Sequence, residues 1–447
     1  MKHVQRIIIL GGAESGIGAA VLAQSRGYDV FVSDNKLIKQ NFKDQLYESN
    51  IRFEENAHSE EEILNAHEII KSPGIPEEAS IIQLVRRKSI PVISEIEFAS
   101  RFTQSTIIAI TGTNGKSTTA SLTYYILNKA GLDVSLVGNI GKSFAHQIAI
   151  NDTAYYVVEI SSFQLDDCYQ FKPHISVLTN ISHNHLDRYH YETVRYANAK
   201  LRIVQKQGAD DYFIYNADDE ATSEAVRRHV VPSEKLSFSQ YIKLQQGAYL
   251  DNNEIIFQSK KNSFSMALFN LGLRGKHNVY NSMAAGIVAS TLDIRKEVIR
   301  ESLADFKSLE HRLEWVADVH GIEFINDSKA TTVNAVWYAM ESISKPIIWI
   351  AGGVDKGNDY SLLVSLVLSK VKAIVCMGID NRKIHEAFGR SVDMIVNTQS
   401  MNDAVKSAYR LATNGECVLL SPACASFDLF EDFEDRGRQF KEVVKSL

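Results

Sequence analysis

One glycine-rich segment constrains the fold more than any other part of the sequence. Residues 111–118, TGTNGKST, follow the apolar run Thr106–Ile110 and precede a helix expected over Lys116–Ala130. Where a glycine turn joins a strand to a helix, backbone N–H groups and the helix dipole point at one spot and bind an anion. Lys116 would then reach the terminal phosphates of a nucleotide, and the Ser117 hydroxyl would bind Mg²⁺. The segment predicts an α/β fold that binds ATP through Gly112, Thr113, Asn114, Gly115, Lys116, Ser117 and Thr118.

The spacing of this loop departs from the general phosphate loop. The common pattern has a glycine five residues before the Gly-Lys pair. Here that position is Ile110, and the first glycine is Gly112. The string is therefore a distinct variant, and the alternative interpretation is a glycine-rich turn that only exposes a lysine.

Three blocks follow one another along the chain. Its 447 residues suffice for two to four domains. Strand-length apolar runs alternate with amphipathic helical stretches, which favours α/β units with parallel sheets. The first block opens with the strand Arg6–Leu10 and the glycine turn 11–16, typical of a nucleotide-binding βαβ unit. We place domains at 1–100 (Rossmann-like), 101–309 (phosphate-loop type) and 310–447 (Rossmann-like).

Composition excludes several classes of protein. The net charge is −6 without a long Lys/Arg block, so nucleic acid is a poor partner. No apolar stretch approaches the roughly 18 residues of a membrane span, and the N-terminus does not resemble a signal peptide. The four cysteines lack zinc-ligand spacing and are expected to be reduced thiols. The chain is therefore expected to be cytoplasmic and to act on soluble small molecules.

Polar residues follow the strands of the second block. Glu159 ends the strand Tyr155–Ile160, at the edge where α/β sheets bind ligands, and is a natural second Mg²⁺ ligand. His185 follows the run Ile175–Asn180, but imidazole suits softer metals than magnesium. From the residues alone, His185 is equally a ligand, a substrate contact or a plain loop residue.

Several strings in the second and third blocks resemble the Mur ligases, the ATP-dependent amide-bond-forming enzymes of peptidoglycan precursor synthesis. The strings are 111–118 (TGTNGKST), 159–165 (EISSFQL), 185–189 (HLDRY), 199–202 (AKLR), 275–278 (GKHN), 326–331 (NDSKAT), 352–357 (GGVDKG) and 421–428 (SPACASFD). The strings DSKAT and SPACASFD point to the D-glutamate-adding branch of the family. The likeness covers nearly the whole chain and is weakest in the first hundred residues.

The resemblance implies a reaction. ATP would phosphorylate the carboxylate of UDP-N-acetylmuramoyl-L-alanine to an acyl phosphate, which the amine of D-glutamate attacks. Lys116 would help to neutralise the charge repulsion between carboxylate and triphosphate. By likeness Lys200 carries a carbamate derived from CO2, which with Glu159 and His185 holds a second Mg²⁺. Lys116, Glu159, His185 and Lys200 are the expected catalytic residues.

The resemblance also assigns binding residues. Asn278, Asn281, Arg312 and Asp327 match ATP-contacting positions. Lys329, Thr331, Lys356, Ser426 and Phe433 match positions around the D-glutamate carboxylates, where cations and donors are needed. Ser15, Asp34, Ser72, Asn139 and His185 are expected to bind the UDP substrate. The chain departs from the family at Thr332, where Asn is frequent, and at Asn35-Lys36, which follow Asp34.

Three alternatives compete with this interpretation. Residues 11–18 resemble the glycine turn of short-chain dehydrogenases, and Tyr196 with Lys200 forms a Tyr-x-x-x-Lys pair. That reading leaves the phosphate loop and the third block unexplained. A related ligase with another acceptor (L-alanine, a diamino acid or folate glutamate chains) is the second, and an ATP-binding regulator without turnover is the third. The sequence leaves oligomeric state open, and a monomer is expected.

Overall fold

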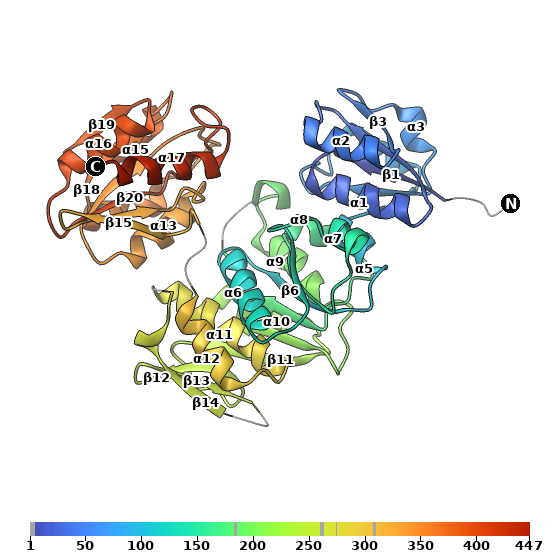
Figure 1. The fold of residues 1–447 in the computed structure, drawn as a ribbon, viewed down its shortest axis with the longest axis horizontal. Coiled ribbons are helices and arrows are strands. Elements are labelled where there is room, and N and C mark those ends of the chain that lie inside the picture. Colours follow the sequence, from blue (N-terminus) through green and yellow to red (C-terminus); the bar gives the residue numbers. More distant parts are fainter. Residues whose placement is uncertain (1–4, 183–185, 260–262, 274, 307–309) are drawn as a thin grey trace. The chain divides into compact units, whose positions relative to one another are not determined.

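The computed structural model describes residues 5–182, 186–259, 263–273, 275–306 and 310–447 (Figure 1). It has three sheets, each with its own helices, and most neighbouring strands run parallel. The predicted three-domain α/β fold with parallel sheets is therefore confirmed. The chain forms two compact units, one of Met1–Leu271 with Val279–Phe306 and one of Gly272–Asn278 with Lys307–Leu447. The first unit contains the N-terminal and central sheets.

The N-terminal sheet has the order β3-β2-β1-β4-β5 and is parallel throughout. Its central strand is a run of apolar residues because helices cover both faces of a parallel sheet. Ile7 to Leu10 are accordingly buried. The elements are β1 (Arg6–Leu10), α1 (Glu14–Ser25), β2 (Asp29–Asp34), α2 (Gln40–Glu48), β3 (Arg52–Glu55), α3 (Glu60–Leu64), β4 (Glu68–Lys71), α4 (Ser80–Arg87), β5 (Val92–Ile93) and α5 (Glu95–Ser100).

The central sheet has the order β14-β13-β12-β11-β10-β9-β6-β8-β7. It is parallel from β7 to β12, and the two remaining strands are antiparallel. The strands are β6 (Thr106–Thr111), β7 (Val134–Gly138), β8 (Tyr155–Glu159), β9 (Ile175–Leu178), β10 (Tyr212–Asn216), β11 (Glu234–Ser239), β12 (Gly247–Asp251), β13 (Glu254–Gln258) and β14 (Ser263–Ala267). The helices are α6 (Lys116–Lys129), α7 (Phe144–Ile150), α8 (Ser162–Asp166), η1 (Leu186–Tyr189), α9 (Thr193–Leu201), η2 (Arg202–Val204), α10 (Glu220–Arg228), η3 (Leu268–Asn270), α11 (Lys276–Thr291) and α12 (Lys296–Asp305).

One predicted helix of this domain ends early. The sequence pattern predicts a helix from about Glu192 to Gln207, but α9 ends at Leu201 and a short 3₁₀ turn follows. Here Arg202 Nε donates to the Leu165 carbonyl oxygen at 2.8 Å, and Gln205 Nε2 donates to that of Cys168 at 2.7 Å. These bonds to a distant segment compete with continued helix, as tertiary contacts commonly override local propensity.

The C-terminal sheet has the order β15-β16-β20-β17-β18-β19, in which the last strand in sequence lies between β16 and β17. Its core includes Trp349, which is fully buried and donates from Nε1 to the Ser421 carbonyl oxygen at 2.7 Å. The elements are β15 (Glu314–Val319), β16 (Ile322–Asn326), α13 (Val333–Ser342), β17 (Ile347–Ala351), η4 (Ser361–Leu363), α14 (Val364–Lys370), β18 (Val371–Met377), α15 (Arg382–Phe388), β19 (Ile395–Thr398), α16 (Met401–Leu411), β20 (Cys417–Leu420) and α17 (Phe433–Lys445).

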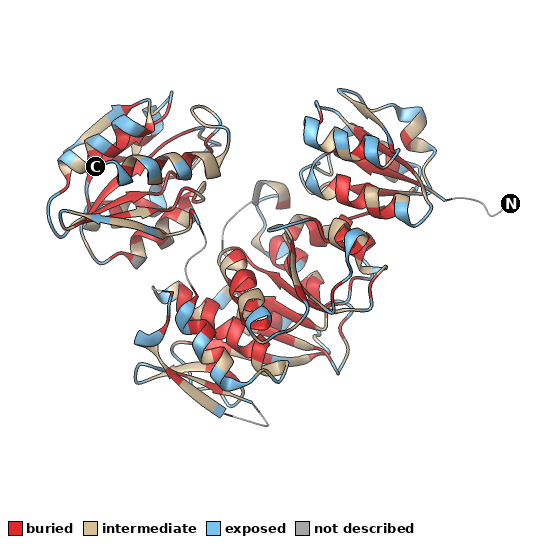
Figure 2. Cartoon of the chain, in the orientation of Figure 1, coloured by how far each residue is buried: buried red, intermediate tan, exposed pale blue. Residues whose placement is uncertain are grey.

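Burial follows the strands and the inner helix faces (Figure 2), and several ionisable side chains of the first unit are buried as well. Glu95, the first residue of α5, is 3% exposed. Its Oε1 accepts hydrogen bonds from Ser143 Oγ and from the Ala145 backbone N–H, both at 2.7 Å, whereas no described residue hydrogen-bonds to its buried Oε2. Burial raises the pKa of Glu95 to about 7, although these hydrogen bonds act in the opposite direction.

The raised pKa of Glu95 makes stability depend on pH. The folded protein holds the Glu95 proton more tightly than the unfolded chain does. Protonated Glu95 therefore contributes its full share to the free energy of unfolding below about pH 4.5, and this share is lost as the pH rises through 7. At about 1.4 kcal/mol per pKa unit, this pH-dependent part of the free energy of unfolding amounts to a few kcal/mol. We expect Glu95→Gln to gain stability relative to the unmutated protein between pH 4.5 and 8, measured by urea unfolding.

The exposed helix residue Glu61 offers a matched control. Glu61→Gln should keep the pH dependence of the unmutated protein. Parallel curves for Glu95→Gln and the unmutated protein would contradict the assignment of this titration to Glu95.

Candidate functional site

The phosphate loop lies between β6 and α6, as predicted, and two of its glycines are required by space. Gly112 has φ 146° and Gly115, the N-cap of α6, has φ 80°. A Cβ on Gly112 would lie 1.9 Å from Thr179 Oγ1, and one on Gly115 would lie 2.4 Å from Asn281 Oδ1. Both the left-handed backbone and the close neighbours therefore exclude any side chain.

Two residues that directly follow β9 hold this loop in shape. The Thr113 N–H donates to the Asn180 carbonyl oxygen at 2.9 Å, and the Asn114 N–H donates to Asn180 Oδ1 at 3.0 Å. Thr179 Oγ1 donates to the Asn114 carbonyl oxygen at 2.6 Å. Sequence reasoning missed Thr179 and Asn180 as site residues, although a polar pair at the end of a buried strand is the signal that could have found them.

Two lysines meet at one carbonyl oxygen of the loop. Lys116 Nζ donates to the carbonyl oxygens of Gly112 at 2.9 Å and Thr113 at 2.7 Å. Lys200, which is 1% exposed, donates from Nζ to the same Gly112 oxygen at 2.8 Å. Burial lowers the pKa of Lys200 well below its usual range, and the positive charge of Lys116 lowers it further. Both effects make the neutral amine more accessible at position 200 than at an exposed lysine.

The Tyr-x-x-x-Lys pair, Tyr196 and Lys200, also lies at the phosphate loop. Tyr196 lies one turn before Lys200 on α9, and its hydroxyl is 3.2 Å from Thr113 Oγ1. Lys200 Nζ lies 4.3 Å from the centre of the Tyr196 ring. Both side chains of the pair thus pack against the phosphate loop.

Glu159 presents a buried oxygen that fits a cation. It is the last residue of β8 and 1% exposed. Asn139 Nδ2 donates to its Oε1 at 2.9 Å, whereas its buried Oε2 has no hydrogen-bond partner among the described residues. A buried carboxylate oxygen normally has a partner, and a metal ion would supply one. Ser117, 3% exposed at the start of α6, could be a further ligand.

Of the other predicted ligands of this metal, Lys200 lies at the phosphate loop. His185 lies outside the described residues. Within the part of the chain that the structure describes, no three His, Cys, Asp or Glu side chains are grouped to hold a metal.

The residues expected to bind the UDP substrate are partly brought together. Asp34, at the end of β2, accepts from the Gly12 N–H at 2.7 Å. The Ser72 N–H donates to the Leu10 carbonyl oxygen at 2.9 Å, and in the described part of the chain nothing hydrogen-bonds to the buried Ser72 Oγ. Ser15 lies in the first turn of α1. These residues line the carboxyl ends of β1, β2 and β4, while Asn139 contacts Glu159 of the central domain instead.

The residues expected to bind D-glutamate follow three neighbouring strands. Lys329 and Thr331 come after β16, Ser426 after β20 and Lys356 after β17, and these strands are adjacent. Lys329 Nζ lies 5.1 Å from the centre of the ring of Phe433, the first residue of α17. Ser426 is buried and Lys356 is exposed. The strand order therefore gathers residues that are up to about a hundred positions apart.

The predicted nucleotide contacts lie on α11 and around β16. Asn278 and Asn281 are one turn apart on α11, and Asn281 Oδ1 accepts from Thr119 Oγ1 at 3.2 Å. Asp327 is buried and accepts from Ser421 Oγ at 2.8 Å and from the Leu313 N–H at 3.2 Å. Burial raises the pKa of Asp327 to about 7. Arg312 precedes β15 and is half-buried.

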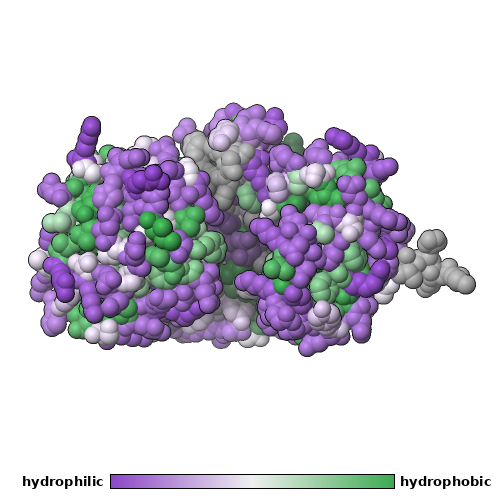
Figure 3. Space-filling view, turned by 90° about the horizontal axis from the view of Figure 1, so that it is seen from above, coloured by the Kyte–Doolittle hydropathy of each residue, from purple (hydrophilic) through white to green (hydrophobic). Residues whose placement is uncertain are grey.

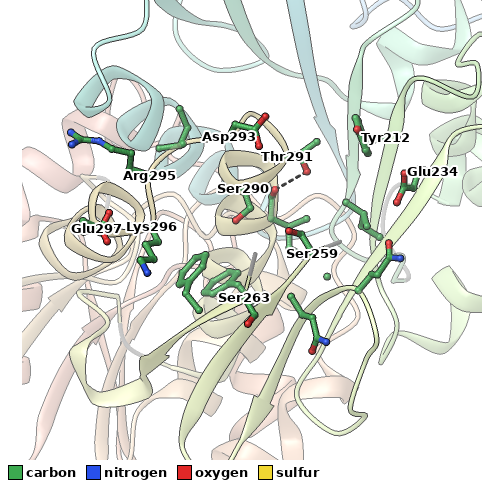
Figure 4. Close-up of a pocket in the computed structure, with 18 residues that line it drawn as sticks. Tyr212, Glu234, Ser259, Ser263, Ser290, Thr291, Asp293, Arg295, Lys296 and Glu297 are labelled. Carbon is green, nitrogen blue, oxygen red and sulfur yellow. Dashed lines mark hydrogen bonds between the residues drawn. The ribbon is translucent and has the colours of Figure 1, made fainter. Parts of the chain in front are cut away.

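A separate cavity of about 440 Å³ opens at the edge of the central sheet where β10 and β11 begin (Figure 4). Tyr212 and Glu234, the first residues of β10 and β11, line it, together with Thr291 at the end of α11. The phosphate loop follows the carboxyl end of β6, and these strands run parallel to it, so the cavity lies at the opposite edge. None of the predicted site residues lines it.

The visible surface in Figure 3 is mainly hydrophilic, with smaller hydrophobic areas between. In the described part of the chain, every helix is too short or too polar to cross a membrane.

Family models cover most of the chain. Residues 7–81 match the MurD N-terminal domain, residues 110–289 match the Mur ligase middle domain, and residues 311–424 match the Mur ligase glutamate ligase domain. The chain belongs to the Mur ligase family. This membership confirms the resemblance inferred from the motifs and excludes the dehydrogenase alternative.

Curated relatives resemble this Mur ligase over its full length. UDP-N-acetylmuramoylalanine–D-glutamate ligase of Christiangramia forsetii is 50% identical, over 99% of this chain and 100% of the relative. The enzyme of the same name from Bacteroides fragilis is 49% identical, with the same shares covered.

Solved structures share the fold at low identity. UDP-N-acetylmuramate-alanine ligase MurC from Thermotoga maritima has a TM-score of 0.63 at 17% identity, with 99% of each chain covered. MurF ligase from Thermotoga maritima, in complex with ADP, has a TM-score of 0.61 at 14% identity, with 100% of each chain covered.

A pair of glycines at the two ends of α6 tests the phosphate loop. Gly115 and Gly131 have similar φ angles of 80° and 83°, but a Cβ on Gly131 meets nothing within 4 Å. Gly115→Ala and Gly131→Ala thus share backbone strain of the same kind and differ in the clash with Asn281. We expect Gly115→Ala to weaken ATP binding at least tenfold more than Gly131→Ala, measured by titration calorimetry. Equal affinities would show that this loop does not bind the nucleotide.

Proposed function

We propose that this Mur ligase joins D-glutamate to UDP-N-acetylmuramoyl-L-alanine in peptidoglycan precursor synthesis, with conversion of ATP to ADP and phosphate. The observation that carries the proposal is the 50% identity, over the full length of both chains, with a ligase of that name. The geometry supports it, because the phosphate loop, two lysines and a buried carboxylate converge in the central domain.

Each domain would hold one substrate. The N-terminal Rossmann-like domain, 1–100, would bind the UDP substrate through Ser15, Asp34 and Ser72, with Asn139 and His185 from the central domain. The central phosphate-loop domain, 101–309, would bind ATP through residues 112–118, Asn278 and Asn281. The C-terminal Rossmann-like domain, 310–447, would supply Arg312 and Asp327 to ATP and bind D-glutamate through Lys329, Thr331, Lys356, Ser426 and Phe433. A cytoplasmic monomer stays a prediction.

The reaction would proceed through an acyl phosphate. The substrate carboxylate oxygen attacks the γ-phosphorus of ATP, and ADP leaves. The D-glutamate amine then attacks the acyl carbon, phosphate leaves with the bonding electrons, and the nitrogen loses a proton. Lys116 and the loop N–H groups would hold the phosphates while negative charge moves between them. Two Mg²⁺ ions would screen the repulsion between the two anionic reactants. Ser117 would hold one of them, and Glu159, His185 and modified Lys200 would hold the second.

Lys200 would carry a carbamate. Its neutral amine would add to CO2 and release a proton, which converts a cationic side chain into an oxygen donor. The buried Nζ and its depressed pKa support this chemistry, because an ammonium group cannot attack CO2. The carbamate would be a donor that the described acidic residues alone do not provide for Glu159.

A phosphate-release assay across amino acids tests the acceptor. With ATP, Mg²⁺ and UDP-N-acetylmuramoyl-L-alanine present, we expect turnover with D-glutamate and less than about 1% of that rate with L-glutamate, L-alanine or a diamino acid. A discrimination of this size fits a site built to pair with charged groups of one stereochemistry. Equal turnover with L-alanine or a diamino acid would assign the chain to another branch of the family.

Chemical rescue tests the carbamate. Lys200→Ala removes the modified side chain, so we expect a loss of activity of at least a hundredfold and a partial recovery when short carboxylic acids are added. The exposed Lys206, in the segment after α9, offers the control Lys206→Ala, which should keep full activity and show no response to the acids. Absence of rescue with correctly folded Lys200→Ala would argue against the carbamate and leave the ligase assignment intact.

A further inference from the structure

Arg436 is buried in a way that is rare for an arginine. It lies in the first turn of α17 and is 0% exposed, among the largest fully buried side chains of the described chain. Removing a guanidinium group from water costs several kcal/mol unless its donors are satisfied. Its hydrogen bonds therefore indicate what the residue holds in place.

The guanidinium group joins two loops of the C-terminal domain. Its Nε donates to Ser328 Oγ at 2.9 Å, and Nη2 donates to the Ser328 carbonyl oxygen at 2.8 Å. Both Nη1 and Nη2 donate to the Cys424 carbonyl oxygen at 3.2 Å. Ser328 follows β16 and Cys424 follows β20, so one planar fork fixes the separation of two loops that leave neighbouring strands.

A third segment is connected through Ser328. Its Oγ accepts from Arg436 and donates to the Phe433 carbonyl oxygen at 2.8 Å. Each residue held in this network is a proposed D-glutamate contact or lies within two positions of one: Lys329 follows Ser328, Ser426 is two residues after Cys424, and Phe433 is itself held. The network thus sets the relative positions of groups contributed by three separate segments.

The hydrogen-bond acceptors of Arg436 carry no formal charge, although the negative charge of Asp428 also acts on the guanidinium group. Its hydrogen-bond acceptors are a hydroxyl and two carbonyl oxygens, and no ion pair among the described residues includes it. Burial lowers its pKa to about 10, which still leaves the group protonated at neutral pH. A positive charge therefore lies directly beneath the loops, where the low dielectric strengthens its attraction for an anion.

We propose that Arg436 is a positioning residue for the acidic acceptor amino acid. It holds the loops of Lys329, Ser426 and Phe433 in one geometry and adds a buried positive charge that favours a dicarboxylate over a neutral amino acid. The inference rests on the proposed function, because it assumes that these three residues contact the acceptor. A purely structural arginine would instead affect folding and leave substrate affinities alone.

Steady-state kinetics of two variants test this role. Arg436→Met removes the positive charge and the planar guanidinium group but keeps much of the side-chain volume. Arg436→Lys keeps the charge but cannot bridge Ser328 and Cys424, because it lacks the planar group. We expect the KM for D-glutamate to rise at least tenfold in Arg436→Met and less in Arg436→Lys. The KM values for ATP and the UDP substrate should stay within about twofold. The exposed Arg438 on the same helix provides the control Arg438→Met, which should leave all three KM values unchanged.

Several results would overturn the proposal. One is a fall in kcat alone with an unchanged KM for D-glutamate, and another is an equal rise in all three KM values. If Arg436→Met does not fold, the KM values of Arg436→Lys and Ser328→Ala test the proposal instead. Ser328→Ala removes only the hydroxyl link and should also raise the KM for D-glutamate.

Failure of the proposed function and failure of the role of Arg436 can be told apart. If the unmutated protein does not turn over D-glutamate, the proposed function fails, whereas normal turnover with unaltered KM values in the variants rejects only the role of Arg436.

Discussion

The carbonyl oxygen of Gly112 is the contact on which the central domain's site depends. Two lysines from different helices, Lys116 and Lys200, donate to it. The backbone can present this oxygen only because Gly112 adopts a positive φ and lies against Thr179 without a side chain. A side chain there would displace the loop and separate the two amines. The low pKa of Lys200 follows from the same arrangement, since burial and the neighbouring charge of Lys116 both disfavour its protonation.

In each of the three domains, some candidate residues lie in loops that leave the carboxyl ends of adjacent parallel strands, and such loops meet at one edge of the sheet. In the central sheet the loop after β6 is held by residues after β9, and Glu159 ends the neighbouring β8. In the C-terminal sheet the insertion of β20 between β16 and β17 brings the segment around Ser426 beside those of Lys329 and Lys356.

Several ionisable groups are buried in the three domains, and each has a different environment. Glu95 and Asp327 have raised pKa values because burial outweighs their hydrogen bonds. Burial lowers the pKa values of Lys200 and Arg436, and the acceptors around Arg436 satisfy its guanidinium group. Perturbed ionisable groups are common at functional sites and also occur in structural networks, so contacts must separate the two cases. Glu95 bonds to helix α7, whereas Arg436 bonds to the loops of the proposed acceptor site.

The sequence by itself determined the local features. The string 111–118 between an apolar run and a helix predicted the phosphate loop, because short-range backbone preferences decide such an element. The motif strings also identified the family. Only the tertiary structure decided that α9 ends at Leu201, that Thr179 and Asn180 hold the loop, and that Arg436 joins segments about a hundred residues apart. These features depend on strand order and side-chain burial, which no local pattern in one sequence encodes.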